Sequence, residues 1–460
     1  MLLISKFIIS CSKPLKRTYC YNASTNHYIK KYKMVIPKSR ENPVIMKLES
    51  PEFRSIFTDE LKALIDLFKK YNYEIRVAGG AVRDLLMNLQ PKDLDFATTA
   101  TPTEMKKMFE TENIRMINMN GEKHGTITPR INDKQNFEVT TLRIDLVTDG
   151  RHAEVQFTTD WLLDALRRDL TINSLFLDFD GHVYDYFYGY DDLKNRRLVF
   201  VGSAVTRIQE DYLRILRYFR FYGRIAVETN KHEEEILKAI RDNAEGLKNI
   251  SGERMWTELK KILEGNFAGD LLETIIKCGL SEYIGLPENP NIDELRRVWA
   301  RSKNLNMNGI TLLSSILNHI DEAEALHRRL KLSTFDRDLV FFIVNNREPK
   351  LHPSPLLPYQ QIVAKTKSKP SVIKQYVLEV LKYNNSPYLQ EMETWENPKF
   401  PINGTILKEK GVEPGKVMGV VMQELKNIWV DSEFKLDVDE LLSHIPKILN
   451  ELKERKKSKG

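Results

Sequence analysis

The sequence has few cysteines and no long apolar segment. Only three cysteines occur among its 460 residues, at Cys11, Cys20 and Cys278, and none belongs to a CxxC pair. A disulfide framework or a zinc site is therefore not expected, and a reducing compartment fits better. No run of about 18 apolar residues occurs, so the sequence does not support a transmembrane helix.

Acidic residues are absent from the first forty positions, which hold nine lysines and arginines. A basic, acid-poor and serine-containing start is typical of a mitochondrial transit peptide. Residues 2–10 are mostly apolar and would also suit a secretory signal, but Lys6 interrupts that run. We expect a presequence over residues 1–45 and import into mitochondria. Translation from Met34 or Met46 would give an untargeted form in the cytoplasm or nucleus.

Beyond this start, the composition is that of an ordinary soluble protein. Charged residues make up 29% of the chain and hydrophobic residues 42%. The length allows roughly two to four domains and a sizeable core. A net charge of +6 permits a polyanionic partner without proving one, so local clusters of arginine and lysine carry more information.

The first part of the chain after this start is predicted to be a small α/β unit. Residues 59–71 have the apolar spacing of an amphipathic helix. Thr101 and Glu104 have the spacing of a helix-capping box, with Pro102 at the first helical position. Between and after these helices, β-rich segments occur at residues 73–78, 125–128 and 137–141.

The rest of the chain is predicted to be helical. Helical periodicity with short breaks covers residues 207–224, 231–243, 253–264 and 268–278. Four prolines between Pro349 and Pro358 indicate a further boundary near residues 346–358. The expected class is α+β, an α/β head followed by helical parts. We expect a presequence, head, neck, body and tail at residues 1–45, 46–180, 181–265, 266–348 and 349–460.

The most informative segment joins two glycines to two acidic residues. Gly79-Gly80 follows a predicted strand and opens a predicted helix, which lets the backbone approach an anion closely. Asp93 and Asp95 stand two apart in an extended segment, so both carboxylates face one side and can hold a divalent metal ion. A phosphate pocket beside a metal site indicates nucleotidyl transfer. A helix-start turn followed by a solvated acidic strand is the plainer alternative.

These residues resemble the signature of a known family. Residues 79–84 (GGAVRD) with Asp93 and Asp95 are similar to class II tRNA nucleotidyltransferases, the CCA-adding enzymes of the DNA polymerase β superfamily. The resemblance rests on four motifs in the same order, at residues 79–95, 167–173, 210–217 and 251–254. It spans roughly residues 70–265, and four ordered motifs make it specific. The C-terminal part of the chain matches no motif of the family.

The resemblance implies a two-metal catalytic site in the head. Asp93 and Asp95 would hold two Mg²⁺ ions, one lowering the pKa of the RNA 3′-hydroxyl and one neutralising the triphosphate and pyrophosphate. Superfamily members add a third carboxylate from a neighbouring strand. Glu138, in the β-rich residues 137–141, is the first candidate for this catalytic role, and Asp145 is the second. An ordinary exposed strand acid is the alternative for either.

The resemblance also implies which residues bind the nucleotide, namely Gly79, Gly80, Arg83, Arg168, Asp211, Arg214, Arg217 and Arg220. If residues 207–224 are one helix, Asp211 and Arg214 project from neighbouring turns of one face. Asp211 would accept the exocyclic amine of cytosine or adenine, and Arg214 would donate to the same base edge. A wrong base edge costs about 1–3 kcal/mol, so the pair selects C and A without a template.

Several of these residues have simpler explanations. Arg83 could form a surface ion pair with Asp84. Asp211 and Arg214 could form an exposed i,i+3 pair worth only ~0.3–0.5 kcal/mol. Core packing explains the neighbouring aromatic residues more simply than base stacking does, at Tyr218, Phe219, Phe221 and Tyr222.

The resemblance implies an ATP(CTP):tRNA nucleotidyltransferase that builds or repairs the 3′-terminal CCA of tRNA. Its substrates would be tRNA, CTP and ATP, its cofactor Mg²⁺, and no membrane partner is expected. The sequence does not indicate an oligomeric state. A poly(A) polymerase, or an enzyme adding only CC or only A, shares every motif quoted above. A catalytically silent tRNA-binding protein is the alternative of another class, and the intact Asp93 and Asp95 argue against it.

Overall fold

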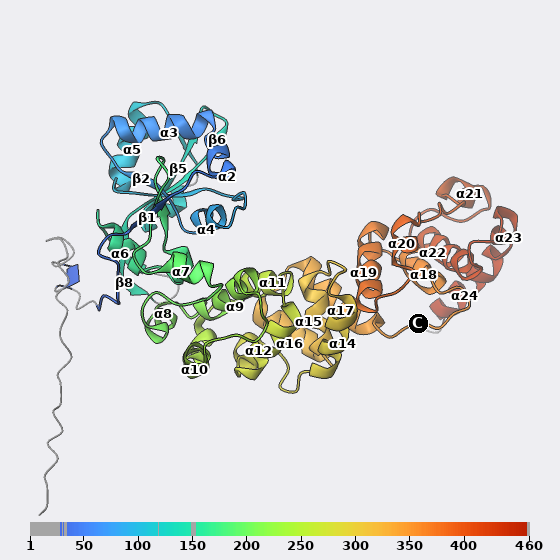
Figure 1. Cartoon of the computed structure of the whole chain (residues 1–460). Coiled ribbons are helices and arrows are strands. Elements are labelled where there is room, and N and C mark those ends of the chain that lie inside the picture. The colour runs from blue at the N-terminus through green and yellow to red at the C-terminus, as the bar shows by residue number, and fades with distance from the viewer. Residues whose placement is uncertain (1–27, 30, 32–34, 118, 149–152, 458–460) are drawn as a thin grey trace, which may run out of the picture. The chain divides into compact units, whose positions relative to one another are not determined.

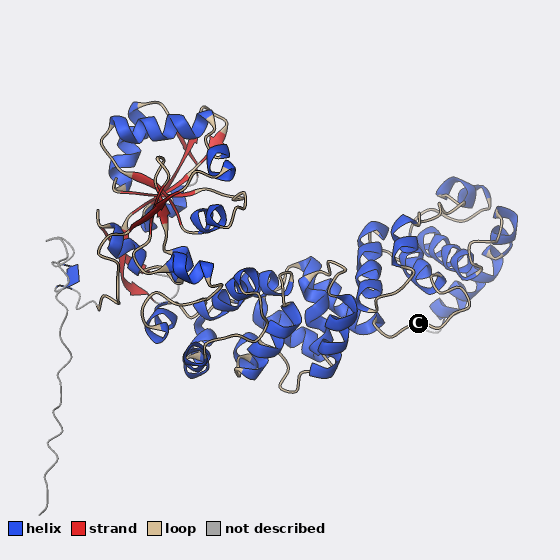
Figure 2. Cartoon of the chain, in the orientation of Figure 1, coloured by secondary structure: helices blue, strands red, loops and turns tan. Residues whose placement is uncertain are grey.

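The computed structural model describes residues 28, 29, 31, 35–117, 119–148 and 153–457. The chain divides into two compact units. Figure 1 labels their helices and strands. The first comprises the chain up to Tyr218 with Ile225–Val227 and His232–Asn243, and the second comprises Phe219–Arg224, Glu228–Lys231 and the chain from Ala244. All described strands lie in the first unit (Figure 2), so the predicted α+β class is confirmed. Among the described residues, no helix combines the length and apolar composition needed to cross a membrane.

The first unit is built on a mixed β-sheet. Its strands run in the order β1 (Val44–Lys47), β11 (His182–Tyr184), β10 (Phe176–Leu177), β2 (Ile75–Ala78), β3 (Asp95–Thr98), β7 (Glu138–Thr141), β5 (Thr126–Ile131) and β4 (Arg115–Ile117). β6 (Gln135–Asn136) pairs with β5, and β8 (Arg143–Thr148) pairs with β9 (Ala153–Phe157) in a separate ribbon. Of the described pairs only β3 and β7 are parallel, so the two strands start at the same edge.

The helices and 3₁₀ turns of the first unit are α2 (Pro51–Ser55), α3 (Asp59–Lys70), α4 (Gly80–Leu86), α5 (Pro102–Thr111), η1 (Met119–His124), α6 (Trp161–Leu166), η2 (Thr171–Asn173), α7 (Gly189–Lys194), α8 (Ala204–Glu210) and α10 (Glu234–Asp242). α9 (Arg214–Ile225) contains the boundary between the units. The expected capping box is confirmed, because Thr101 and Glu104 bond each other's backbone at the start of α5.

Each face of the sheet has its own apolar core. On one face, Phe96 of β3 lies edge-on to Phe137 at 5.6 Å, and Phe68 of α3 meets Phe109 of α5 at 6.1 Å. On the other face, Trp161 of α6 packs against Phe176 of β10 at 4.9 Å. Burying each such side chain contributes about 1.5–3 kcal/mol, which fixes the strands that carry the site.

The expected presequence, residues 1–45, falls mostly outside the described residues. Its last part is described and contacts the segment that follows β11 in the first unit. The amide of Arg40 donates to the Tyr186 carbonyl at 3.0 Å, and the amide of Asp185 donates to the Pro43 carbonyl at 2.8 Å. The Arg40 guanidinium also pairs with Asp191 and, at 3.5 Å, with the fully buried Asp185. These contacts tie residues 40–44 to the sheet.

The second unit is helical. It contains η3 (Ala244–Asn249), α11 (Gly252–Leu263), α12 (Ala268–Lys277), α13 (Ser281–Ile284), α14 (Ile292–Ser302), α15 (Gly309–Leu313), η4 (Ser314–Ile316), α16 (Ile320–Leu330), α17 (Thr334–Asn346), α18 (Leu357–Lys365), α19 (Pro370–Tyr383), α20 (Leu389–Thr394), α21 (Gly404–Glu409), α22 (Lys416–Asp431), α23 (Val438–Ser443) and α24 (Ile445–Lys457). No helix covers residues 347–356, where the prolines indicated a boundary. The finer division at residues 181–265, 266–348 and 349–460 stays a prediction.

Candidate active site

Three acidic residues gather at the edge where β3 and β7 begin. Asp95 is the first residue of β3 and Glu138 is the first residue of β7. The parallel register pairs these two residues directly, so their side chains leave the same face of the sheet. Asp93 lies in the bend just before β3, and all three side chains are exposed. The structure thus brings Glu138 to the aspartate pair.

The charges of this edge act on one another. Asp95 is exposed as a residue, but protein atoms around its carboxyl group displace water, and this is the first reason why its pKa lies above the ordinary value. Repulsion by Glu138 and Asp93 raises the pKa further. Arg168 acts in the opposite direction and lowers this pKa. Three carboxylates and one guanidinium therefore share one electrostatic environment. Such crowding of negative charge is what a bound cation relieves.

Asp145, the second candidate for the third carboxylate, lies elsewhere. It belongs to β8 in the separate ribbon, and its carboxylate accepts a hydrogen bond from Arg143 Nε at 3.2 Å. The pairing with Asp95 therefore favours Glu138 as the third carboxylate.

The Gly79-Gly80 turn lies beside Arg168. Gly79 has φ +68°, a conformation that glycine adopts without strain, and it stands just before α4. A Cβ atom at this position would meet Arg168 Nη1 at 2.9 Å, so a side chain there would displace the Arg168 guanidinium. The turn thus holds the backbone close to a positive charge, as the predicted anion pocket requires.

Arg83 is buried rather than on the surface. Its Nε and Nη2 atoms donate to Asp84 Oδ1 at 3.1 and 2.9 Å, and Nη1 donates to Asn173 Oδ1 at 2.5 Å. Only 2% of the residue is exposed. The ion pair with Asp84 that was the alternative for Arg83 is therefore present, but inside the protein. A contact between Arg83 and a triphosphate stays a prediction.

Arg168 is held by a carboxylate that the sequence reasoning did not single out. Asp164, fully buried in α6, accepts from Arg168 Nε and Nη2 at 3.2 and 3.0 Å and from Arg167 Nε at 2.7 Å. Burial would raise the pKa of Asp164, but the two arginines outweigh it and hold the pKa below its ordinary value. In the sequence, only the position of Asp164 three residues before the Arg167-Arg168 pair indicates that it could bind these arginines.

Asp211 and Arg214 do not share one helix, so the predicted continuous helix over residues 207–224 is wrong. Asp211 caps the end of α8 with extended backbone (φ −151°, ψ 105°), and α9 begins at Arg214. The Asp211 carboxylate accepts from the amide of Leu213 at 3.1 Å, which stabilises the break. A tight turn, with the Arg214 amide donating to the Asp211 carbonyl at 2.9 Å, still keeps the two residues near each other.

The Arg214 guanidinium has three anchors in the first unit. Nη1 donates to Glu210 Oε2 at 2.6 Å and to the Arg207 carbonyl at 3.0 Å, and Nη2 donates to the Arg167 carbonyl at 2.9 Å. The anchors join α9 to the chain that follows α6. Glu210 and the carbonyl of Arg167 were not foreseen as partners.

The two remaining arginines bind carboxylates in different units. Arg217 donates through Nε to Asp169 Oδ2 at 2.7 Å. Burial opposes the charge of Asp169, yet Arg217 and neighbouring donors hold the pKa of Asp169 at about 2. Arg220 pairs with Glu258 of α11 at 3.0 Å in the second unit. The aromatic residues next to these arginines in the sequence are buried, so core packing is confirmed for Tyr218, Phe219, Phe221 and Tyr222.

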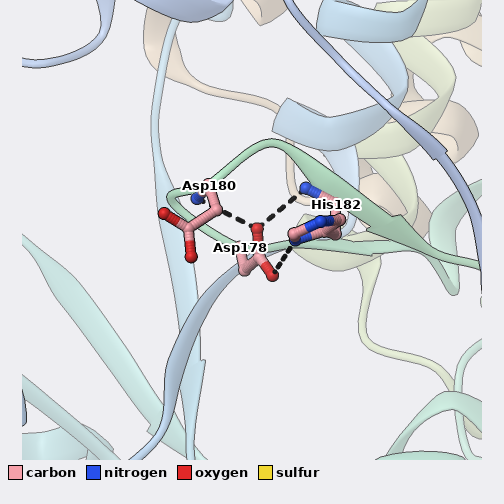
Figure 3. Close-up of side chains that lie close together, drawn as sticks. All are labelled: Asp178, Asp180 and His182. Atoms are coloured by element: carbon pink, nitrogen blue, oxygen red, sulfur yellow. Dashed lines mark hydrogen bonds and ion pairs between the residues drawn. The ribbon is translucent and has the colours of Figure 1, made fainter.

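A second group of possible metal ligands lies in the turn between β10 and β11 (Figure 3). Ligand atoms of Asp178, Asp180 and His182 lie within 4.8 Å of one another and could hold a metal ion. Asp178 already accepts from the amides of Asp180 and His182, from His182 Nδ1 and from the Tyr184 hydroxyl. These bonds account for the group as a hairpin turn, and no sequence motif pointed to it.

Comparison with known families defines the class of the head. Residues 75–199 match the model of the Poly A polymerase head domain, and residues 231–291 match the model described as probable RNA and SrmB- binding site of polymerase A. With its acidic edge beside a glycine turn, the protein is a nucleotidyltransferase.

Relatives that match most of the chain define the family. The chain is 52% identical over 403 residues to CCA tRNA nucleotidyltransferase 1, mitochondrial, of Danio rerio, covering 86% of this chain and 93% of the relative. It is 51% identical over 407 residues to the Homo sapiens protein of the same name, covering 87% and 93%. Its fold matches the Bacillus stearothermophilus CCA-adding enzyme in complex with CTP, with TM-score 0.67, 24% identity and coverage of 89% and 100%. The chain belongs to the CCA tRNA nucleotidyltransferase family.

Proposed function

We propose that this protein builds and repairs the 3′-terminal CCA of tRNA in mitochondria, using CTP and ATP and releasing pyrophosphate. The observation that carries the proposal is the register of β3 with β7, which sets Asp95 beside Glu138 in reach of Arg168. The mitochondrial tRNA nucleotidyltransferases that match nearly their whole length to this chain support the substrate and the location.

Asp93 and Asp95 would hold Mg²⁺, with Glu138 as the third carboxylate. Carboxylate oxygens are the ligands that Mg²⁺ prefers, and a divalent cation would relieve the repulsion that raises the pKa of Asp95. The chemistry that such ions supply is a lower pKa for an attacking hydroxyl and neutralisation of a triphosphate. The role of the chain is to keep the carboxylates together, which the paired strands do through their backbone hydrogen bonds.

The triphosphate would lie against the Gly79-Gly80 turn. The space beside Gly79 is taken by the Arg168 guanidinium, and Arg83 lies one helical turn further along α4. Two guanidinium groups beside a turn without side chains provide positive charge and a close backbone approach, which are the requirements for binding phosphate.

Base selection would depend on Asp211 and Arg214 across the break between α8 and α9. A carboxylate accepts from the exocyclic amine of cytosine or adenine, whereas uracil and guanine present an oxygen there. The three anchors of Arg214 limit the orientations of its guanidinium, so less conformational freedom is lost when it meets a base. The pair would therefore select C and A without a template.

The test is nucleotide incorporation into tRNA trimmed to the residue before CCA. With CTP alone we expect two added residues, with ATP alone none, and with both the complete CCA. The products are resolved to single nucleotides on a denaturing gel, with tRNA that already ends in CCA as the control.

The same assay separates the alternatives. A long adenosine extension would overturn the proposal in favour of a poly(A) polymerase. A product that stops at CC with both nucleotides present, or addition of A only to tRNA ending in CC, would indicate a partial enzyme. Binding of tRNA without any incorporation would indicate the catalytically silent protein.

A further inference from the structure

One buried side chain outside the predicted site joins several of its groups. Asn173 ends the 3₁₀ turn η2 and is only 7% exposed. Its carbonyl oxygen accepts from Arg168 Nη1 at 3.3 Å, and its side-chain Oδ1 accepts from Arg83 Nη1 at 2.5 Å. Its Nδ2 donates to Asp169 Oδ1 at 3.3 Å. A single residue thus contacts Arg83, Arg168 and Asp169.

Two of these contacts, with Arg83 and Arg168, lie close to the Gly79-Gly80 turn. Arg168 is the group that a Cβ atom at Gly79 would meet at 2.9 Å, and the same hypothetical atom would lie 3.5 Å from the Asn173 carbonyl oxygen. Arg168 also lowers the pKa of Asp95, which places it within electrostatic reach of the carboxylate edge. Asn173 therefore fixes both guanidinium groups beside the proposed phosphate pocket.

The third contact leads to the helix that follows Asp211. Asp169 binds the Asn173 amide through Oδ1 and Arg217 of α9 through Oδ2, at 2.7 Å to Nε. Its Oδ1 also accepts from the Leu170 amide at 2.8 Å, so the carboxylate cannot turn freely. The path from Arg83 to Arg217 is continuous through Asn173 and Asp169, and every group on it is part of the first unit.

We propose that Asn173 is a positioning residue for nucleotide binding, which sets Arg83 at the triphosphate and, through Asp169, Arg217 on the base-selecting helix. This inference rests on the proposed function. The amide of asparagine presents an acceptor for Arg83 and a donor for Asp169 on one short rigid group, as the two contacts require. An aspartate would repel Asp169, and an apolar residue would leave both partners without their hydrogen bonds.

The test measures KM and kcat for CTP and for ATP on trimmed tRNA, with the melting temperature of each variant. Removing the amide by Asn173→Ala should raise both KM values about tenfold, since two hydrogen bonds to charged groups are lost, while kcat falls less than about threefold. Asn173→Ser, which keeps a polar group but is too short to reach both partners, should raise KM similarly. Asn195→Ala, which loses one bond to the Asp191 carbonyl at a helix end, is the matched control and should change neither constant.

Coupling distinguishes positioning from a general structural role. If Asn173 acts through the arginines, adding Asn173→Ala to Arg83→Gln or to Arg217→Gln should raise KM by no more than about twofold beyond the worse single variant. The inference would be overturned if the effects of the two substitutions on KM multiplied in the double variants, or if Asn173→Ala left KM unchanged. A loss of kcat that follows the fall in melting temperature would also overturn it. If the unmodified chain incorporates no nucleotide, the proposed function fails instead.

Discussion

At the scale of residues, the site depends on carboxylates that the sheet holds together against their repulsion. The parallel pairing of β3 with β7 fixes Asp95 opposite Glu138. The pKa of Asp95 is raised first by the loss of water around its carboxyl group and then by repulsion from Glu138 and Asp93. Arginines of the predicted site are held by buried carboxylates, as Arg168 is by Asp164 and Arg217 by Asp169. The raised pKa of Asp95 is therefore a cost to stability at the edge of the sheet, whereas the buried carboxylates limit the orientations of the arginines they bind.

The raised pKa of Asp95 predicts the sign of a stability change. A carboxyl whose pKa is raised by folding costs stability where it is ionised, and the cost disappears as the pH falls through the folded value to below the unfolded one, about 4. Asp95→Asn should therefore raise the melting temperature at pH 7 without added metal, and this gain should vanish in acid.

The measurement is thermal unfolding of both proteins between pH 3.5 and 8, with and without Mg²⁺. Added Mg²⁺ should stabilise the unsubstituted protein more than the variant. Asp66→Asn, on the exposed face of α3, is the control. A lower melting temperature for Asp95→Asn at pH 7 would contradict the proposed repulsion.

Glu138 and Asp145 can be told apart by mutation. Glu138→Gln should lower kcat for CMP incorporation about a hundredfold, because a third metal ligand is lost. Asp145→Asn should change kcat less than about threefold, because Asp145 pairs with Arg143 in the separate ribbon. The measurement is the steady-state rate at saturating CTP and tRNA. A larger loss of kcat for Asp145→Asn than for Glu138→Gln would assign the third carboxylate to Asp145.

Individual site residues could be predicted from the sequence best where the chemistry depends on residues close together in the chain. The Gly79-Gly80 turn and the pair Asp93 and Asp95 could be found from motif and spacing alone. Burial could not be foreseen, and so Arg83 was expected on the surface if it paired with Asp84. Asn173 lay inside a quoted motif, but its three partners come from distant parts of the chain, and no local pattern encodes them.

At the scale of elements, capping signals predicted helices better than periodicity did. The start of α5 followed from Thr101, Pro102 and Glu104 because a capping box is a local interaction. The break between α8 and α9 was missed because the apolar periodicity continues across it. Asp211 was the available signal, since aspartate favours the position just before a helix start and accepts from a nearby amide, as it does here from Leu213 before α9.

The segment before β1 predicts a difference between two shortened chains. A chain starting at Met46 lacks Arg40, which leaves the buried Asp185 without its ion pair, and also lacks the first half of β1. Asp185 keeps the amides of Phe187, Gly189 and Tyr190 as donors, so loss of the partly exposed Arg40 should cost about 1–3 kcal/mol. A chain starting at Met34 keeps these contacts and loses Tyr28, which packs against the core around Trp161, so it should be less stable than the full-length protein but more stable than the Met46 chain.

Urea unfolding of the two shortened chains and of full-length Arg40→Ala measures this difference. Arg40→Ala should account for much of the loss seen with the Met46 chain. Equal unfolding midpoints for the Met34 and Met46 chains would show that residues 34–45 contribute nothing to the fold.

At the scale of the whole molecule, the sequence predicted the class of architecture and left its division open. The α+β class and the helical C-terminal part are confirmed, since helical periodicity is a repeated signal over many residues. The boundary between the compact units falls within α9, where no proline, glycine cluster or composition change marks it. The match over 93% of the Danio rerio relative extends the family assignment beyond the residues that carry the motifs.

The most direct test of the account is magnesium-dependent incorporation of labelled CMP and AMP into end-trimmed tRNA by the full chain and by Asp93→Ala. We predict that the full chain completes CCA only with Mg²⁺ and that Asp93→Ala, folded to the same melting profile, is at least about a thousandfold slower. Full incorporation by Asp93→Ala, or incorporation by the full chain that is indifferent to chelation of Mg²⁺, would contradict the account.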